Sequence, residues 1–388
     1  MVMPRIAFWG FFMKEFNNKT EKDQDAFYMQ MAIELAKKGR GFVSPNPLVG
    51  AVIVKNNIVI GEGYHEYYGG PHAEVNAIKN ANSDIKGATI YVTLEPCSHY
   101  GKTPPCSLAI IQNKISRVVI GSLDPNPLVS GKGIEMIRNA GIRVDTGVLE
   151  QETQKLNEVF FKFIQTKEPF ILMKTAMSLD GKIATSNGDS KWISGEQSRS
   201  KVHQMRNEYS AIMVGINTVI NDNPLLNVRN IPGKTKNPIR IIIDSKARTP
   251  LDADIVNTPE ISPVIVAVTK KAEKENIDKL SKKGVKVIVC PEKEKVIDLK
   301  YLIKEIGKLN IDSILLEGGG TLNFGAIEQN IVDKVITFIS PKIIGGKEAA
   351  TPVEGVGFKR IADTVELEKL NYILSGEDIM VEGYIKKN

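Results

Sequence analysis

The chain has 388 residues, a length that predicts two domains or three. Hydrophobic residues make up 42% and charged residues 25%, which excludes a collagen-like, disulfide-scaffold or wholly disordered chain. No run of 18 apolar residues is present, so no membrane-spanning helix is expected. The net charge of +6, from 51 Lys and Arg against 45 Asp and Glu, is spread along the chain. It favours small phosphorylated molecules over nucleic acid as partners.

The cysteines indicate a reducing compartment. Cys97, Cys106 and Cys290 are an odd number for a chain of this size, which predicts a cytoplasmic protein that uses cysteine for metal binding or chemistry. Residues 1–21 contain a short apolar run at Ile6–Met13. This run lacks the length and the cleavage site of a signal peptide, so we expect a non-catalytic extension.

The first half of the chain then alternates between helical and β-rich segments. Ala26, Met29, Ile33 and Ala36 recur at three- and four-residue spacing, which predicts a helix over 23–38. Predicted strands follow at 48–54, 58–64, 88–94, 117–121 and 142–145, with helices opening at Pro71 and spanning 105–113 and 133–139. The alternation predicts a sheet flanked by helices in a domain of residues 22–148, followed by a helical connector at 149–168.

The second half restarts this alternation and is predicted to form a domain of residues 169–388. Predicted strands are 170–176, 211–214, 239–244, 264–268, 285–289, 313–316 and 334–339, and predicted helices are 196–207, 299–308 and 322–329. The Lys/Glu-rich stretch around 270–283 is predicted to be a solvated surface segment. The last 60 residues carry no assignable motif.

A His/Cys/Cys set with a nearby carboxylate predicts a zinc hydrolase site in the first domain. The predicted ligands are His72, Cys97 and Cys106, and Glu74 follows His72 by two residues. A catalytic zinc takes three protein ligands and keeps one position for water, whose pKa it lowers to about 7. A carboxylate that does not bind the metal can carry the proton to the leaving nitrogen, as in the zinc deaminases.

The strength of this prediction lies in the combination of motifs. An H-x-E match alone is a weak signal, but both Pro-Cys pairs lie where a predicted strand ends and a helix begins. Eight residues separate Cys97 from Cys106, where the base deaminases have two. The alternatives are a structural zinc site, with His99 or His65 as the fourth ligand, and a buried pair of reduced cysteines.

The segments around these residues resemble the riboflavin-pathway pyrimidine deaminases, including the long loop between the cysteines. They are Pro45–Gly50, Gly61–His65, Gly70–Glu74 and Glu95–Cys106. The resemblance implies that the pyrimidine or its ribose phosphate is contacted by Asn46, His65, His99 and Lys102. Lys102 offers a cation to a phosphate, and Asn46 offers a donor and an acceptor to a base edge. The alternatives are Asn46 as a turn residue between prolines and Lys102 as a solvated charge.

A strand that runs into three glycines marks a candidate phosphate site in the second domain. G-x-G-x-x-G is absent from this half, so a Rossmann-type dinucleotide site is not supported. Instead Leu315-Leu316-Glu317 precedes Gly318-Gly319-Gly320 and a predicted helix. Backbone N–H groups at such a junction form an anion nest suited to pyrophosphate. The alternative is a glycine-rich turn that serves only tight packing.

Further segments resemble the reductase half of the bifunctional riboflavin-biosynthesis deaminase–reductases. They are Lys174–Lys182, Trp192–Ser194, Asn217–Val219, Asp222–Leu226, Ile243–Ser245 and Leu315–Thr321. The resemblance implies NADPH contacts at Ala176, Trp192, Thr218, Asp222, Ser245, Gly319, Gly320, Thr321, Leu322, Asn323, Phe324 and Gly325. It implies substrate contacts at Ser190, Arg206, Leu226, Arg229 and Glu317.

The same resemblance places Lys174 and Asp222 near the ribose that is reduced, as catalytic residues. Arg206 and Arg229 suit the sugar phosphate, because guanidinium forks match its oxygens. The alternatives are a surface lysine at a strand end for Lys174 and a half-buried packing residue for Trp192.

The resemblance runs from about residue 22 to the C-terminus. It implies an α/β fold, with an N-terminal cytidine-deaminase-like zinc domain followed by a dihydrofolate-reductase-like domain. It also implies a bifunctional enzyme that first deaminates 2,5-diamino-6-(5-phosphoribosylamino)pyrimidin-4(3H)-one hydrolytically. The enzyme would then reduce the ribosylamino group of 5-amino-6-(5-phosphoribosylamino)uracil to ribitylamino.

Zn²⁺ and NADPH are the expected cofactors, although the sequence does not separate NADPH from NADH. A homo-oligomer is expected, with no nucleic-acid or membrane partner. The rival hypotheses are a protein with one vestigial half, a nucleic-acid base editor or RNA-binding module, and a non-catalytic zinc-stabilised binding protein. An aromatic content of 6% counts against the nucleic-acid reading.

Overall fold

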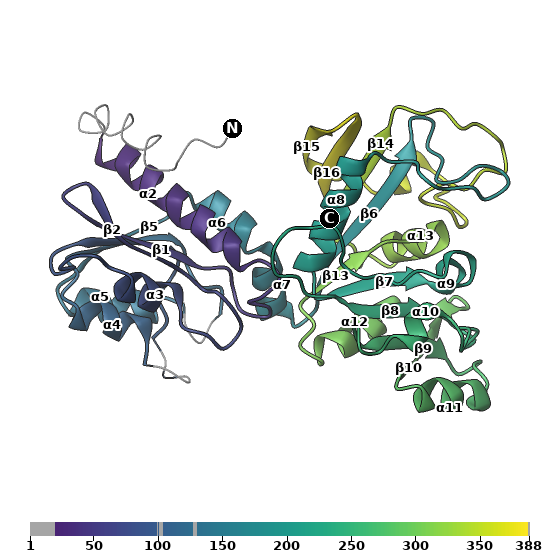
Figure 1. Ribbon diagram of the computed structural model, residues 1–388, viewed down its shortest axis with the longest axis horizontal. Helices are drawn as coiled ribbons and strands as arrows, with labels where there is room; N and C mark the ends of the chain where they lie inside the picture. The colour runs from purple at the N-terminus through teal and green to yellow at the C-terminus, as the bar shows by residue number, and fades with distance from the viewer. Residues whose placement is uncertain (1–19, 99, 101–103, 127–129, 387–388) are drawn as a thin grey trace. The chain divides into compact units, whose positions relative to one another are not determined.

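The computed structural model describes residues 20–98, 100, 104–126 and 130–386 (Figure 1). The chain divides into two compact units, one that ends at Gln165 and one that begins at Thr166. Each unit is built on its own β-sheet. Within the described ranges, the search for a helix of membrane-spanning length and hydropathy finds none.

The first unit contains a five-stranded sheet in the order β2-β1-β3-β4-β5. Its strands are β1 (Gly50–Lys55), β2 (Ile58–Tyr64), β3 (Thr89–Leu94), β4 (Arg117–Ser122) and β5 (Arg143–Thr146). β1 pairs antiparallel with β2 and β3, whereas β3, β4 and β5 are parallel. The helices are α2 (Glu21–Ala36), η1 (Lys37–Gly39), α3 (Ala73–Lys79), α4 (Cys106–Gln112), α5 (Lys132–Asn139), α6 (Glu150–Leu156) and α7 (Glu158–Thr166).

Helices cover both faces of this sheet, because both faces of the central strands are apolar. On β1, Ala51 and Ile53 pack into a core with α3, α4 and α5. Val52 and Val54 face the other way, into a core with α2 and α6. A strand that is buried on both faces reads as a continuous apolar run, as this one does. Gly63 of β2 allows α3 to approach closely, because a Cβ there would stand 2.4 Å from the Ala73 carbonyl oxygen.

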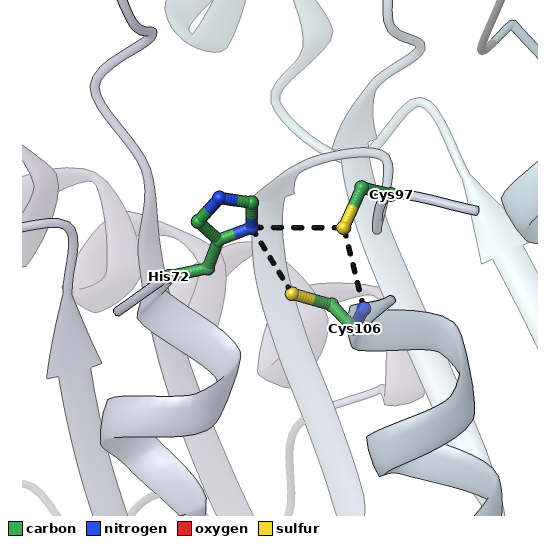
Figure 2. Close-up of side chains that lie close together, drawn as sticks. All are labelled: His72, Cys97 and Cys106. Carbon is green, nitrogen blue, oxygen red and sulfur yellow. Dashed lines mark hydrogen bonds between the residues drawn. The ribbon is translucent and has the colours of Figure 1, made fainter. Parts of the chain in front are cut away.

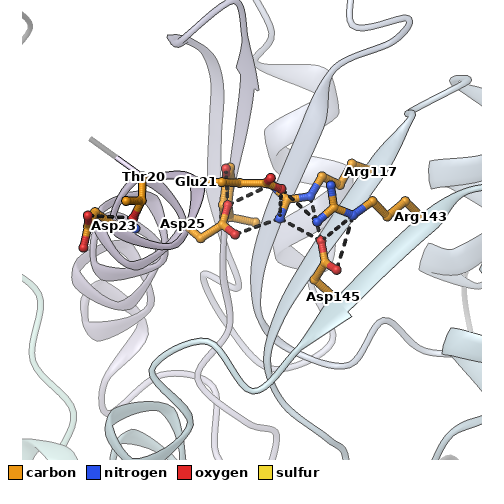
Figure 3. A network of polar contacts seen from close by, with 8 residues as sticks. Thr20, Glu21, Asp23, Asp25, Arg117, Arg143 and Asp145 are labelled. Carbon is orange, nitrogen blue, oxygen red and sulfur yellow. Dashed lines mark hydrogen bonds and ion pairs between the residues drawn. The ribbon is translucent and has the colours of Figure 1, made fainter. Parts of the chain in front are cut away.

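An ion-pair network holds α2 on the sheet (Figure 3). The guanidinium of Arg117 donates to both carboxylate oxygens of Asp25 at 2.7 and 2.8 Å, and to Asp145 at 2.7 Å. The hydroxyl of Tyr91 also donates to Asp25, at 2.9 Å. The Asp25 carboxylate is buried and fully paired, so its loss would remove one of the counter-charges of a largely buried guanidinium.

The second unit contains a nine-stranded sheet in the order β10-β9-β8-β7-β13-β6-β14-β16-β15. Its strands are β6 (Phe170–Ser178), β7 (Ala211–Gly215), β8 (Ile239–Ile243), β9 (Val264–Thr269), β10 (Lys286–Cys290), β13 (Ser313–Leu316), β14 (Lys334–Ser340), β15 (Leu367–Ser375) and β16 (Asp378–Ile385). In this spatial order, all strands from β10 across to β14 are parallel. β16 and β15 then extend the sheet as antiparallel strands. A separate short hairpin pairs β11 (Glu292–Lys293) with β12 (Val296–Ile297).

The helices of this unit lie on both faces of the sheet. They are α8 (Glu196–Glu208), α9 (Ile216–Asp222), α10 (Asp254–Asn257), α11 (Lys274–Lys282), α12 (Leu299–Gly307) and α13 (Gly320–Glu328), with the 3-10 turn η2 (Ile361–Asp363). Apolar side chains of α12 and α13 cover one face of the central strands. Side chains of α9, α10 and α11 cover the opposite face.

Three features of the second unit differ from the sequence-based expectation. The prediction of a solvated segment at 270–283 is wrong in part, because α11 forms there and buries Leu280 against the sheet. Because α11 carries many exposed Lys and Glu residues, its short apolar stripe is difficult to recognise in the sequence. α13 begins at Gly320, two residues before the predicted start. The C-terminal segment without a motif forms the two strands β15 and β16.

Candidate functional site

A candidate metal centre lies where three elements of the first unit meet (Figure 2). His72 is the N-cap of α3, Cys106 is the first residue of α4, and Cys97 follows the end of β3. The Nδ1 atom of His72 lies 3.2 Å from Sγ of Cys106 and 3.6 Å from Sγ of Cys97. All three ligand atoms lie within 4.8 Å of one another, and both cysteines are free thiols.

These residues fit a zinc ion. Zinc binds Cys sulfur at about 2.3 Å and His nitrogen at about 2.0–2.1 Å, so tetrahedral angles separate N from S by about 3.6 Å. The two distances from His72 Nδ1 lie at or near this value. Hydrogen bonds from Cys106 and His72 lower the pKa of the Cys97 thiol well below its usual value, which favours the thiolate that a metal needs.

Glu74 lies beside this cluster, in the first turn of α3. It is 3% exposed, and burial raises the pKa of its carboxyl group to about 7. The positive charge of His72 opposes that rise, while the negative charge of Cys97 adds to it. A carboxyl group with a pKa near neutrality can both take and return a proton, as a general acid–base requires.

His65 and Asn46 form a hydrogen-bonded pair next to His72. Nδ1 of His65 lies 3.0 Å from the carbonyl oxygen of Pro71, and Nε2 lies 3.2 Å from Nδ2 of Asn46. Because a carbonyl only accepts, Nδ1 carries the hydrogen, and Nε2 of the neutral ring accepts from Asn46. Burial lowers the pKa of His65 and so favours this neutral form. Nδ2 of Asn46 is therefore the donor in this pair, and the amide oxygen takes no part in it.

In the second unit, three buried charged side chains meet near the end of the central strands. Lys174 lies on β6, Arg206 on α8, and Glu317 directly after β13. Arg206 donates to both carboxylate oxygens of Glu317, at 2.7 and 2.8 Å, and Nζ of Lys174 lies 4.0 Å from the same carboxylate. Their side chains are 9 to 15% exposed.

Lys174, Arg206 and Glu317, which we call the triad, affect one another's pKa values. Burial opposes ionisation of Glu317, but the positive charges of Arg206 and Lys174 and the Arg206 hydrogen bonds hold its pKa at about 2. Burial lowers the pKa of Lys174, which the charge of Glu317 opposes. The triad therefore presents a fixed carboxylate between two cations, one of which can release a proton more easily than an exposed lysine.

Two family models of known proteins match this chain, one in each unit. The family model of the cytidine and deoxycytidylate deaminase zinc-binding region matches residues 22–122, and that of the RibD C-terminal domain matches residues 169–381. The riboflavin biosynthesis protein RibD of Actinobacillus pleuropneumoniae is 50% identical over 364 residues, which cover 94% of this chain and 96% of the relative. The chain belongs to the RibD family. The relative from Aquifex aeolicus is 46% identical over 360 residues, 93% of this chain and 98% of its own length.

Solved RibD structures have the same fold. Form 1 of Acinetobacter baumannii RibD superposes with a TM-score of 0.83 at 38% identity, over 95% of this chain and 100% of that chain. A diaminohydroxyphosphoribosylaminopyrimidine deaminase/5-amino-6-(5-phosphoribosylamino)uracil reductase from Thermotoga maritima has a TM-score of 0.83 at 40% identity, with the same coverage. The predicted order, a cytidine-deaminase-like domain followed by a reductase domain, is thus confirmed, and the chain is a deaminase and reductase of riboflavin biosynthesis.

Two of the predicted deaminase contacts, His99 and Lys102, lie outside the described residues. The remaining ones, Asn46 and His65, lie beside the metal cluster, as given above. His65 is not part of that cluster, since its two ring nitrogens are paired with Pro71 and Asn46. The structural-zinc alternative with His65 as fourth ligand is therefore not supported.

The glycine-rich segment of the reductase unit forms the N-terminus of α13. Gly319 is the N-cap, and a Cβ at Gly320 would stand 2.7 Å from the carbonyl oxygen of Thr351, so only glycine fits there. Thr218 lies close to Gly319, with its Oγ1 3.8 Å from where a Cβ would be. Backbone N–H groups at this helix start can receive a phosphate. The side chains of Asn323 and Phe324 are buried within the unit.

The other predicted reductase residues are placed in different environments. Lys174 is buried in the triad, which contradicts the surface-lysine alternative. Trp192 is 60% exposed and stacks under the Arg199 guanidinium at 4.8 Å, so it is not a half-buried packing residue. The side chain of Leu226 is buried in the core. The half-buried positions are Ala176, Ser190, Thr218 and Ser245, and the exposed ones are Asp222 and Arg229. Among the described residues, no hydrogen bond or ion pair joins Asp222 to Lys174.

Sequence reasoning missed two residues that hold Cys97 in place. The buried carboxylate of Glu95 accepts from the backbone N–H groups of Gly131 at 3.0 Å, Gly133 at 3.1 Å and Asp124 at 3.4 Å, and so fixes the start of α5. Ser107 donates through Oγ and N to the carbonyl oxygen of Cys97, at 3.0 and 3.2 Å. A charged residue between an apolar strand and Pro-Cys was the available signal for Glu95.

His203 is a third residue that the sequence did not single out. It lies one turn before Arg206 on α8. Burial and the charges of Arg206 and Arg229 lower the pKa of His203 to about 4, so its imidazole is neutral. It adds a neutral polar group to a site that otherwise consists of charges.

Proposed function

We propose that this chain carries out two consecutive reactions on one phosphorylated aminopyrimidine. The first is zinc-dependent hydrolytic deamination of 2,5-diamino-6-(5-phosphoribosylamino)pyrimidin-4(3H)-one. The second is NADPH-dependent reduction of 5-amino-6-(5-phosphoribosylamino)uracil, which converts its ribosylamino group to ribitylamino. The observation that carries the proposal is the convergence of His72, Cys97 and Cys106 beside buried Glu74.

In the deaminase unit, His72, Cys97 and Cys106 are the proposed ligands of zinc. Zinc bound there would supply a water nucleophile that is activated at neutral pH. Glu74 takes the proton of that water and delivers it to the amine that leaves C2 as ammonia. Burial suits Glu74 to both steps, because it brings the pKa of its carboxyl group to about 7.

Asn46 and His65 are proposed to orient the pyrimidine, together with His99 and Lys102. The His65 ring holds the Asn46 amide in one orientation through the hydrogen bond between Nε2 and Nδ2. Asn46 can then accept from an amino group or ring N–H of the base through Oδ1. Lys102 is the proposed cation for the ribose phosphate.

In the reductase unit, NADPH would supply the hydride to C1′ of the opened ribosylamino group. Lys174 is the proposed source of the accompanying proton, because its burial lowers its pKa and Glu317 lies 4.0 Å away. Arg206 and Arg229 are proposed to hold the sugar phosphate, with Ser190, Leu226 and Glu317 as further substrate contacts. Asp222 is proposed to lie near the reduced ribose when both ligands are bound.

The proposed NADPH site joins the start of α13 to the ends of the neighbouring strands. Its contacts would be Ala176, Trp192, Thr218, Asp222, Ser245 and Gly319–Gly325. A preference for NADPH over NADH is supported by Lys246 and Arg248, two exposed cations within the three residues after Ser245. Arg248 reaches Asn217, with Nη2 3.2 Å from Oδ1, and a guanidinium in such a place suits a 2′-phosphate.

The remaining organisation is also proposed. We assign the deaminase domain to residues 22–148, a connector to 149–168, the reductase domain to 169–388 and a non-catalytic extension to residues 1–21. All three cysteines are free thiols, which supports a reducing compartment, the cytoplasm. We further propose that the enzyme is a homo-oligomer.

Mass spectrometry of the diaminopyrimidinone ribose phosphate tests the two reactions. The substrate is incubated with the zinc-loaded protein, first without and then with NADPH. We expect one amine to be replaced by oxygen in both cases, and two hydrogens to be gained only with NADPH. An unchanged substrate mass would overturn the proposal, and deamination without reduction would overturn its second half.

A further inference from the structure

The turn between the last two strands of the reductase unit contacts the start of α8 (Figure 1). Ser375 ends β15, Asp378 begins β16, and the two residues pair with each other. Oδ2 of Asp378 accepts from the backbone N–H of Gly195 at 2.8 Å. The hydroxyl of Ser198 lies 3.1 Å from Oγ and 3.3 Å from the carbonyl oxygen of Ser375. The C-terminal segment without a sequence motif therefore holds the start of α8 in place.

Asp378 is a buried carboxylate without a cationic partner. It is 1% exposed, and among the described residues no Lys, Arg or His forms an ion pair with it. Gly195, the N-cap of α8, has no side chain that could cap the helix. Asp378 accepts from the same backbone N–H that a capping-box side chain uses, and the helix N-terminus stabilises its charge. Because a buried carboxylate that lost this bond would be left unsatisfied, the contact fixes the point at which the chain enters α8.

The four residues Trp192–Gly195, which we call the pre-helix segment, are held by charged side chains from three parts of the unit. Each side chain bonds one backbone group of the segment: Nζ of Lys342 donates to the carbonyl oxygen of Trp192, Nη1 of Arg199 donates to the carbonyl oxygen of Ser194, and Asp378 accepts from the N–H of Gly195. Lys342 follows β14, whereas Arg199 lies on α8 and Asp378 on β16. The backbone of a short loop segment is thus restrained at three of its four residues.

This restraint extends to the side chain of Trp192. The ring is exposed to solvent, and the guanidinium of Arg199 lies 4.8 Å from the ring centroid. The backbone N–H of Arg199 donates to the carbonyl oxygen of Gly195 at 3.1 Å, so the position of Gly195 sets that of the guanidinium. One face of the indole is therefore covered by a cation, and the ring loses rotamer freedom that an exposed side chain would otherwise keep.

We propose that Asp378 and Arg199 are positioning residues of the reductase reaction. They hold the pre-helix segment, and through it they hold the Trp192 ring where the cofactor binds. The inference rests on the proposed NADPH contact at Trp192. A contact group that is ordered before binding loses less conformational entropy when the cofactor arrives. Asp378 and Arg199 therefore act on the affinity for NADPH and not on the transfer of hydride. The alternative is that Asp378 only stabilises the fold.

Time-resolved fluorescence anisotropy of Trp192 tests the local order in full-length protein without cofactor. The sequence has two Trp residues, so Trp9→Phe leaves Trp192 as the single reporter. In Asp378→Ala we expect the amplitude of the fast depolarisation, which reports picosecond-to-nanosecond motion of the side chain, to rise about twofold or more. Asp378→Asn should restore most of the order, because its amide oxygen can still accept from Gly195.

Steady-state kinetics test the effect on the cofactor. In Asp378→Ala we expect the KM for NADPH to rise roughly tenfold and kcat to change by less than about threefold, the pattern of lost cofactor binding. The matched control is Glu377→Ala, which removes an exposed carboxylate from the same turn. It should change neither the anisotropy nor the KM. A residue that served stability alone would lower the free energy of unfolding and leave both readouts unchanged.

Arg199→Met keeps the test decisive if Asp378→Ala does not fold. Arg199 is only half-buried, and its loss removes both the bond to Ser194 and the cation on the Trp192 ring. We expect the same changes in anisotropy and KM as for Asp378→Ala. An unchanged anisotropy in either variant would overturn the proposal, and so would greater motion of Trp192 with an unchanged KM for NADPH.

Failure of the proposed function would look different. A wild-type protein that does not oxidise NADPH with the deaminated pyrimidine would overturn the proposed reduction and the cofactor part of this inference. The anisotropy is measured without cofactor, so it still decides whether Asp378 and Arg199 order Trp192.

Discussion

Arg206 and Glu317 form a two-pronged ion pair across 111 residues of sequence, with Nε–Oε1 and Nη2–Oε2 distances of 2.7 and 2.8 Å. Because the pair is buried and Lys174 lies 4.0 Å from the same carboxylate, each charge depends on the other two. Loss of one partner would leave the others uncompensated in a site of low dielectric.

Glu317→Gln is therefore expected to destabilise the reductase unit and to abolish reduction. The variant leaves Arg206 and Lys174 without a counter-charge, and breaking a buried pair from one side costs about 3 kcal/mol or more. Urea unfolding measures the loss of stability, and NADPH oxidation measures the activity. Deamination of the diaminopyrimidinone should persist. Glu305→Gln, which removes the partner of exposed Lys308, is the control and should change neither quantity measurably.

The same pair predicts an acid-dependent loss of stability. The pKa of Glu317 is lowered from 4.5 to about 2 in the folded protein, so the unfolded chain takes up a proton at higher pH than the folded chain. The stabilisation is complete above about pH 4.5 and is lost as the pH falls toward 2. We expect the free energy of unfolding of the reductase unit to decrease more steeply between pH 4.5 and 2 in the wild type than in Glu317→Gln. Parallel pH profiles would show that Arg206 does not hold the carboxylate ionised.

In the deaminase unit, single substitutions should distinguish the residue that carries protons from the residues that bind the metal. Glu74→Ala is expected to keep zinc and to abolish ammonia release, because Glu74 moves protons without binding the metal. Cys97→Ser is expected to lose both zinc and deamination, while the separately supplied deaminated pyrimidine is still reduced. Metal analysis and ammonia release distinguish the two variants. Ammonia release retained by Glu74→Ala would remove this residue from the mechanism.

Glu95 is expected to affect the metal through the position of Cys97. Its carboxylate accepts from two backbone N–H groups at the start of α5 and from that of Asp124, and Cys97 follows two residues later. Glu95→Gln replaces one acceptor oxygen by a donor, so we expect weaker zinc binding by roughly tenfold or more. Competition with a chelator measures the affinity, and the absorption spectrum of the Co²⁺-substituted protein reports the ligand geometry.

The control for this variant is Asp25→Asn, on the opposite face of the same sheet. It removes the carboxylate that pairs with Arg117 and should lower the unfolding temperature without changing zinc affinity. Equal loss of zinc affinity in both variants would mean that Glu95 acts only through general stability.

Arg248→Ala tests the proposed cofactor preference. Removal of this exposed guanidinium, three residues after Ser245, should raise the KM for NADPH about tenfold and leave that for NADH nearly unchanged, since only NADPH has a 2′-phosphate. Steady-state rates with both cofactors measure this. Equal effects on the two would exclude Arg248 from recognition of the 2′-phosphate.

Much of this protein can be predicted from local sequence. The period of the apolar residues identifies most helices and strands, since burial on one or two faces imposes that period on each element. The zinc ligands are recognisable because the chemistry restricts them to a few residue types, and each follows a short local motif. The family resemblance likewise depends on such segments.

The tertiary structure decided what depends on residues far apart in the sequence. The hydrogen bonds from the start of α5 to Glu95 and the ion pair between Arg206 and Glu317 form only when separate strands and helices meet. No local sequence pattern indicates that these residues are in contact. α11 was missed for a related reason, because its apolar stripe is short and only the neighbouring sheet shows which face is buried. Sequence therefore determined which chemical groups are available, and packing determined which of them are neighbours, because contact energies act across space and not along the chain.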